Sequence, residues 1–293
     1  MPGPESKTTA LPDPDTPSDL GLDAILPAVG NIYFELTELF NEPRPVAALA
    51  SGQAVVYYGV AIMSKDGDWV LRETPAACEQ VLSVLESRGA RYRLSAPLDV
   101  RWLRGGWSSH FEFMDDRNRR VRCDFVSRPP RVSHEVLNRL FDEAGAPPLL
   151  TVDVESLIKM KQTQRAKDYA VIAPLATLLP PERELELTTD PDRILELAAA
   201  HGSASSRPAV KAARADRARR AVVVALAEEA DDLQQRDRAR VAVYEAASTR
   251  YVADCRARSL TNLPLRDAHR GMCEVAGRLL PMHPLEGSDA DVE

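Results

Sequence analysis

The sequence has no hydrophobic run that approaches the roughly 20 residues needed to span a membrane, and runs such as residues 221–227 are far shorter. Its first residues lack the basic segment and apolar core that mark a signal peptide. Four cysteines lie far apart, with no CxxC or Cys/His cluster: Cys78, Cys123, Cys255 and Cys273. This spacing argues against a zinc site and a disulfide framework. We therefore expect a cytoplasmic protein without a membrane segment.

The composition is that of an ordinary soluble globular protein, with 44% hydrophobic and 28% charged residues. The net charge of −7 argues against a protein that coats nucleic acid, although it leaves room for a local basic groove. The 293 residues predict one large domain or two modest ones. Composition alone indicates no activity.

Both ends of the chain are predicted to be disordered. Residues 1–25 contain five prolines, five acidic residues and one lysine, so they cannot bury enough apolar surface to offset the entropy of ordering. Residues 286–293 are similarly polar. The predicted folded part therefore runs from about residue 26 to residue 285.

Hydrophobic periodicity predicts strands alternating with helices up to about residue 130, and only helices after that. Strands are expected at residues 54–58, 69–71, 98–103, 109–114 and 120–126, and helices at 32–40, 75–88, 133–144, 152–173, 191–200, 208–256 and 265–280. The 152–173 helix should end or kink at Pro174, and the 208–256 stretch should turn back near residues 230–237. The pattern indicates an α+β fold, a mixed sheet flanked by helices and followed by an all-α region. The pair Pro180-Pro181 suggests a boundary between domains 26–180 and 181–285.

Three carboxylates are the strongest candidates for chemistry. Asp66 and Asp68 open the 69–71 strand, where a period of two directs both side chains to one face. Asp124 lies within an apolar strand, where an unpaired charge is costly. If the two strands are neighbours, the three acids can converge and hold Mg²⁺, which prefers hard oxygen ligands.

Simpler interpretations of these acids also fit the pattern. Asp66-Gly67 between apolar runs is typical of a two-residue hairpin turn. Asp124 could form an ion pair with Arg122 or Arg128. Further along, Lys161, Arg165 and Asp168 would share one face of a continuous helix, either to neutralise phosphates or as a solvated basic face.

Two segments together carry a family resemblance: residues 65–93, from the paired acids through a helix that begins at Thr74-Pro75, and residues 156–175, with Lys161 and the run Arg165-Ala166-Lys167-Asp168. They resemble the nucleotidyltransferase superfamily, in particular its bacterial minimal and abortive-infection-type members and, distantly, the CCA-adding enzymes. The resemblance covers about residues 50–175.

The resemblance implies a Mg²⁺-dependent transfer of a nucleoside monophosphate from an NTP to a hydroxyl of RNA, a protein or a small molecule. It assigns metal binding and catalysis to Asp66, Asp68 and Asp124, and nucleotide binding to Gly59, Lys161, Arg165, Lys167 and Asp168. Gly59 would begin the turn or helix that cradles the triphosphate. Val60 and a short connector to the acids motivate the alternative, a catalytically degenerate member that acts as a binding or antitoxin-like partner.

Overall fold

The computed structural model describes residues 30–142 and 149–286. The predicted disordered ends, 1–25 and 286–293, lie outside these ranges except for Glu286. No helix in the described part of the chain combines the length and apolar character needed to cross a membrane.

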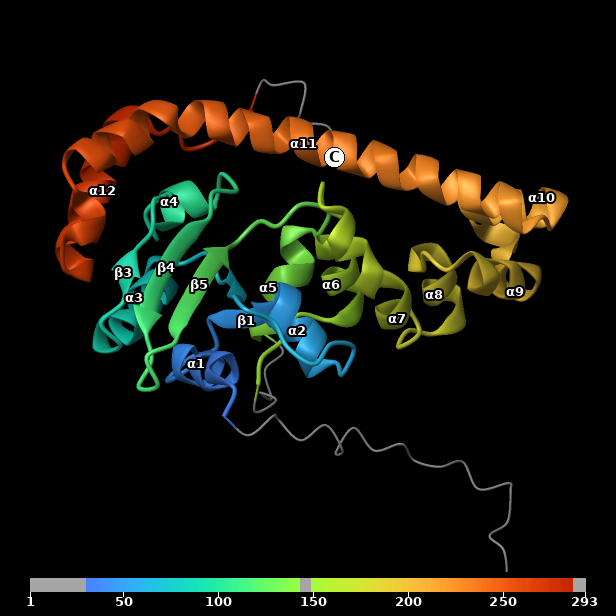
Figure 1. Cartoon of the computed structure of the whole chain (residues 1–293), viewed down its shortest axis with the longest axis horizontal. Helices are drawn as coiled ribbons and strands as arrows, with labels where there is room; N and C mark the ends of the chain where they lie inside the picture. Colours follow the sequence, from blue (N-terminus) through green and yellow to red (C-terminus); the bar gives the residue numbers. More distant parts are fainter. Residues whose placement is uncertain (1–29, 143–148, 287–293) are drawn as a thin grey trace, which may run out of the picture.

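A five-stranded mixed sheet forms the centre of the fold (Figure 1). Its strands are β1 (Ala47–Ala50), β2 (Gly67–Leu71), β3 (Arg91–Tyr92), β4 (Ser109–Met114) and β5 (Arg120–Val126). They lie in the order β1-β2-β5-β4-β3, and only the β2–β5 pair is parallel. This confirms the predicted α+β class with a mixed sheet, flanking helices and a C-terminal helical region.

Side-chain caps explain the first helices. Asn31 accepts a hydrogen bond from the Tyr33 amide at the start of α1 (Ile32–Phe40). Thr74 does the same for Ala77 at the start of α3 (Pro75–Ser87), with proline in the first turn. Both helices were predicted, as was the β4–β5 hairpin, whose turn is closed by Asp115 through the amides of residues 117 and 119.

Two predicted strands are wrong. Residues 54–58 belong mostly to helix α2 (Ser51–Tyr57), and residues 98–103 contain the short helix α4 (Val100–Leu103), capped by Asp99. The true strands β1 and β3 lie just outside the runs that the sequence favoured. Short apolar runs fit either a buried strand or a buried helix, so periodicity cannot separate them.

After β5, the elements of the described residues are all helices, apart from an isolated β-bridge at Thr151. The helices are α5 (His134–Asp142), α6 (Val154–Lys161), η2 (Ala166–Val171), α7 (Ile172–Ala176), α8 (Pro181–Leu187), α9 (Pro191–His201), η3 (Gly202–Ala204), α10 (Pro208–Asp216), α11 (Arg219–Ala257), η4 (Leu260–Asn262) and α12 (Leu265–Leu279). The expected 152–173 helix is interrupted after Lys161, and Pro174 lies inside the first turn of α7, where its missing amide costs no helical hydrogen bond. The 208–256 stretch breaks at Arg217, which is left-handed (φ 49°), and not at 230–237.

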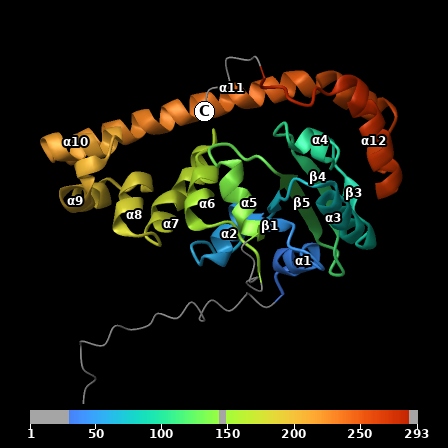
Figure 2. The same cartoon turned by 180° about the vertical axis from the view of Figure 1, so that it is seen from behind.

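Different helices pack against the two faces of the sheet. Trp69 and Phe125 point to the face packed against α1 and α3, and Tyr251 of α11 and Met272 of α12 join the same core. Val70 points to the other face, into a second core with side chains of α5, α6 and α7. Helix α11 runs along one side of the molecule and continues into α12 beside β3 (Figures 1 and 2). The predicted division at 180/181 falls between α7 and α8.

Candidate active site

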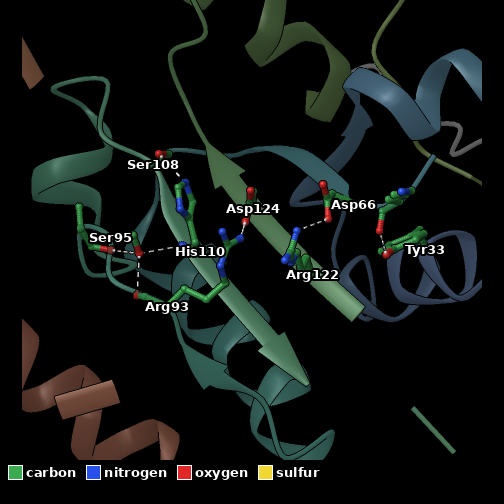
Figure 3. A network of polar contacts seen from close by, with 10 residues as sticks. Tyr33, Asp66, Arg93, Ser95, Ser108, His110, Arg122 and Asp124 are labelled. Atoms are coloured by element: carbon green, nitrogen blue, oxygen red, sulfur yellow. Dashed lines mark hydrogen bonds and ion pairs between the residues drawn. The ribbon is translucent and has the colours of Figure 1, made fainter. Parts of the chain in front are cut away.

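Two carboxylates stand directly opposite each other in the centre of the sheet. The parallel register of β2 with β5 pairs Asp68 with Asp124, and the antiparallel register of β5 with β4 pairs Asp124 with His110. Beyond His110, Arg93 follows β3 and its Nη1 lies 3.3 Å from Asp124 Oδ1. Figure 3 shows Arg93, His110 and Asp124 close together on one face. The convergence of Asp68 with Asp124 results from strand pairing alone.

Asp66 lies beside this pair but has its own partner. Its Oδ1 is 3.5 Å from Arg122 Nη1, and its side chain is 44% exposed. Arg122 is two residues before Asp124 on β5 and stands between Asp66 and Asp124 in Figure 3. The two-residue hairpin at Asp66-Gly67 is excluded, because the strand that pairs with β2 is β1, which is separated from it by α2.

The pKa values of both paired acids are raised. Burial is the main cause for Asp68, whose pKa is about 6, and repulsion by Asp124 adds to it while Lys161 opposes it. Burial also raises the pKa of Asp124 to about 6, with Arg93 opposing and Asp66 adding. Burial lowers the pKa of His110 to about 4, so this histidine is neutral at pH 7. The positive groups near Asp68 and Asp124 therefore do not fully offset the two negative charges.

Lys161 brings a buried ammonium group to the same site. It is the last residue of α6, and its Nζ lies 3.2 Å from Ser51 Oγ and 3.9 Å from Asp168 Oδ1. Burial lowers the pKa of Lys161, while Asp168 and Asp68 act against that effect. Asp168 also accepts hydrogen bonds from Thr163 Oγ1 and Arg165 Nε, both at 2.7 Å. The Asp168 carboxylate thus fixes the position of the lysine.

The structure brings Lys161, Arg165 and Asp168 together by a different route from the one predicted. They do not share one helix face, because α6 ends at Lys161 and η2 begins only at Ala166. Asp168 folds back onto both cations instead. Lys167 is exposed on η2, and its interaction with Lys161 is a longer-range electrostatic repulsion.

Gly59 lies in a turn that follows a helix, and its role in nucleotide binding stays a prediction. Gly59 follows the C-terminal end of α2, where its amide donates to Val56 O, so it begins no helix. The turn from strand to helix is at Ser51-Gly52, directly after β1. Counted from Gly52, the connector to Asp66 is seven residues longer than when it is counted from Gly59.

Ser51 and Gly52 are the site residues that the sequence analysis missed. Ser51 has left-handed backbone (φ 49°), which is costly for a residue with a side chain, and its hydroxyl contacts Lys161. A Cβ on Gly52 would lie 2.2 Å from Ser64 Oγ and 2.9 Å from Ser64 Cβ, so a larger residue would require Ser64 to shift. The pattern that could have revealed them is Ser-Gly immediately after the apolar run 46–50.

The donor chemistry of the pair fits Mg²⁺, since two carboxylates with hard oxygen atoms occupy paired positions on neighbouring strands and Asp124 repels Asp68. Within residues 30–142 and 149–286, no three His, Cys, Asp or Glu side chains form a group ready to hold a metal ion. Asp68 and Asp124 are therefore the part of the predicted trio that strand pairing unites, and Asp66 interacts with Arg122.

No protein-family model matches this sequence, and no curated protein matches it. Two solved structures from H. pylori are similar to the chain: a "putative nucleotidyltransferase" and JHP933. Each has 13% sequence identity and a TM-score of 0.37. The first match covers 71% of this chain and 94% of the other, and the second covers 73% and 94%. At this low similarity, the geometry of the site is the basis for inferring what the protein does.

Proposed function

We propose that the chain is a Mg²⁺-dependent nucleotidyltransferase that moves a nucleoside monophosphate from an NTP to a hydroxyl acceptor. The observation that carries the proposal is the direct pairing of Asp68 with Asp124 on parallel strands, both with pKa values raised to about 6. A buried lysine, held by Ser51 and Asp168, lies near the same carboxylates. This reaction requires carboxylates that bind a cation and a positive group that neutralises the phosphates.

Each residue has a defined task in the proposed reaction. Asp68 and Asp124 hold the cation, which supplies charge stabilisation to the transferred phosphoryl group and the departing pyrophosphate. The acceptor oxygen forms a bond to the α-phosphorus as the bond to the bridging oxygen breaks. The hydroxyl proton passes to a carboxylate oxygen of Asp124, the acid of the pair that stands on β5. Lys161 neutralises phosphate charge, and Asp168 positions Lys161.

The remaining predicted residues take smaller parts in this proposal. Arg165 shares the Asp168 carboxylate and is 54% exposed, so it can approach a phosphate tail from solvent. Lys167 adds positive charge at the same end. Asp66 contributes negative charge near Asp124, and a shift away from Arg122 would make it a third ligand.

The test is transfer of label from α-³²P-labelled NTPs in the presence of Mg²⁺, with acceptors supplied as RNA, as protein and as small hydroxyl compounds. We expect Asp68→Asn and Asp124→Asn to abolish transfer by the purified protein. Glu112→Gln, a change of another acid on the neighbouring strand β4, is the matched control and should retain it. Equal labelling by the Asp68→Asn variant would disprove the site.

One observation favours a second function, a binding or antitoxin-like partner with a degenerate site. Arg122 and Arg93 lie 3.5 and 3.3 Å from Asp66 and Asp124, so arginines already occupy positions beside two of the acids. Calorimetric titration with NTP separates the two functions. A transferase binds NTP more tightly with Mg²⁺ than without it, whereas a degenerate site shows no Mg²⁺-dependent affinity.

A further inference from the structure

A cavity of about 590 Å³ lies under α11, between the segment that follows β5 and the segment that joins α4 to β4. It is separate from the carboxylate pair, since neither Asp68, Asp124 nor Lys161 lines it. Its lining includes five arginines and three acidic residues, together with His134 and Tyr244: Arg104, Arg128, Arg131, Arg236 and Arg240, and Glu135, Asp237 and Glu286. The volume is in the range of small-ligand sites.

Two buried carboxylates hold three arginines at the inner wall of this cavity. Glu73 is almost fully buried, with Arg128 Nε at 2.6 Å and Arg104 Nε at 3.8 Å. Arg131 Nη1 lies 3.7 Å from the buried Asp237 carboxylate. Each carboxylate therefore fixes at least one guanidinium group at the wall.

Arg240 brings a further guanidinium group to the wall. In the described part of the chain, no carboxylate is ion-paired with Arg240, which lies over the Tyr244 ring at 5.2 Å. Arg236 also lines the cavity and pairs with Asp232, and the carboxylates of Glu135 and Glu286 line it as well. Arg240 is thus the arginine of the wall that has no paired carboxylate among the described residues, and an anion beside it would be favoured.

Two polar atoms of the wall lack partners. Arg131 Nη2 and His134 Nδ1 are buried and have no hydrogen-bond partner among the described residues. The other nitrogens of these side chains are engaged, since Arg131 Nε donates to Lys159 O and His134 Nε2 lies 3.5 Å from Glu73. A buried nitrogen without a partner is unfavourable, so a side-chain rotation that opens either nitrogen to an acceptor in the cavity would stabilise the site.

A second cavity, of about 360 Å³, adjoins the first. Gly106, Arg240 and Tyr244 line both. The rest of its wall is largely apolar and aromatic, with Trp107 and Tyr251 among its members. It extends to His110, the cross-strand partner of Asp124, so the pair of cavities leads from the arginines toward the carboxylate pair.

We propose that the two cavities together bind a nucleoside monophosphate, with its phosphate among the arginines of the first cavity and its base in the aromatic second cavity. Phosphate prefers guanidinium partners, and a flat base suits an apolar wall with aromatic rings. Arg240, on the shared wall, spans the two parts. That this nucleotide is the acceptor of the transfer rests on the proposed function, whereas its binding does not.

The experiment is calorimetric titration without divalent metal, with AMP, adenosine and inorganic phosphate as probes. We expect AMP to bind at least tenfold more tightly than adenosine or phosphate. Arg240→Gln should weaken AMP binding roughly tenfold or more, as expected for loss of a charge-assisted hydrogen bond. We expect the same of Arg104→Gln, which changes an arginine with a more exposed side chain. Arg238→Gln, on the same helix and outside both cavities, is the matched control and should bind AMP as the wild type does.

Asp68→Asn separates this proposal from the proposed function, because it should abolish transfer and leave AMP binding intact. AMP binding no tighter than that of adenosine, or equal to that of phosphate, would overturn the proposal. Unchanged binding by both arginine variants, or equal loss in Arg238→Gln, would overturn it as well.

Discussion

Asp68 and Asp124 are direct neighbours across the only parallel strand pair of the described sheet, although 55 residues separate them in the chain. Adjacent carboxylates repel each other, and burial withholds the water that would weaken the repulsion. Arg93 and Lys161 offset part of this repulsion, but the pKa values of both acids remain raised, so the arrangement is unfavourable for folding. Removing one of the two charges, or adding a cation, should then change the stability of the protein.

Asp68→Asn should change how stability depends on pH. The pKa of Asp68 is about 6 in the folded protein and 3.8 in its reference state, so the folded protein binds this proton more tightly. The binding of this proton stabilises the folded protein. That stabilisation is complete below pH 3.8 and is lost as the pH rises through 6. In metal-free buffer, we expect the variant to be about 1–3 kcal/mol more stable than the wild type at pH ~7.5, with the difference disappearing toward pH ~4. Denaturant unfolding across this range measures it, and parallel curves would contradict the expectation.

Mg²⁺ should stabilise the wild-type protein. A cation that binds only the folded state raises the free energy of unfolding by an amount that grows with its concentration over Kd, about 2.7 kcal/mol at one hundred times Kd. We expect the melting temperature to rise with Mg²⁺ and to stay constant in the double variant Asp68→Asn/Asp124→Asn. The control is KCl at equal ionic strength. An equal rise in the double variant would place the Mg²⁺ site elsewhere.

Lys161→Met should reduce transfer by roughly tenfold to one hundredfold, the loss expected when a charge-assisted contact to phosphate is removed. Its matched control is Lys159→Met on the same helix, because Lys159 pairs with Glu155 at 2.9 Å, away from the carboxylate pair. Steady-state kinetics with varied NTP measures both variants. If both lose activity to the same extent, a general effect on α6 is responsible and the role of Lys161 is wrong.

Gly52→Ala should destabilise the turn at the site. The added Cβ would lie 2.2 Å from Ser64 Oγ and 2.9 Å from Ser64 Cβ, and overpacking of this kind costs about 1–3 kcal/mol. Ser64→Gly in the same chain should restore part of the loss. Gly277→Ala in α12 is the matched control, since nothing lies within 4 Å of its new Cβ, and it should be neutral or stabilising by up to about 1 kcal/mol. The measurement is the thermal unfolding of the wild type, Gly52→Ala, Gly52→Ala/Ser64→Gly and Gly277→Ala, with their melting temperatures compared.

Local chemistry accounts for the elements that the sequence predicted well. Thr74-Pro75 starts α3 because the threonine oxygen satisfies an orphan amide and proline fits the first turn. Asp115 closes the β4–β5 turn through two backbone amides. Such contacts span a few residues, so the sequence displays both partners together.

The secondary structure of the short apolar runs was predicted wrongly because the residues that pack against them are far away in the sequence. Residues 54–58 are rich in β-branched and aromatic side chains, yet they form a helix because Ala54 and Val55 pack into the core with α5, α6 and α7. This error also put the strand-to-helix turn at Gly59 and hid Ser51-Gly52. The break at Arg217 likewise had no counterpart among the expected helix stops.

By itself, the sequence determined the α+β class and the helical C-terminal region, because caps, turns and periodicity act over short distances, and it singled out Asp68 and Asp124 as candidates. Only the tertiary structure decided that Asp68 faces Asp124, that Asp66 lies beside Arg122, and that Lys161 reaches Ser51. Strand order and register arise from the burial of both sheet faces at once, and that is a property of the whole chain rather than of any one segment.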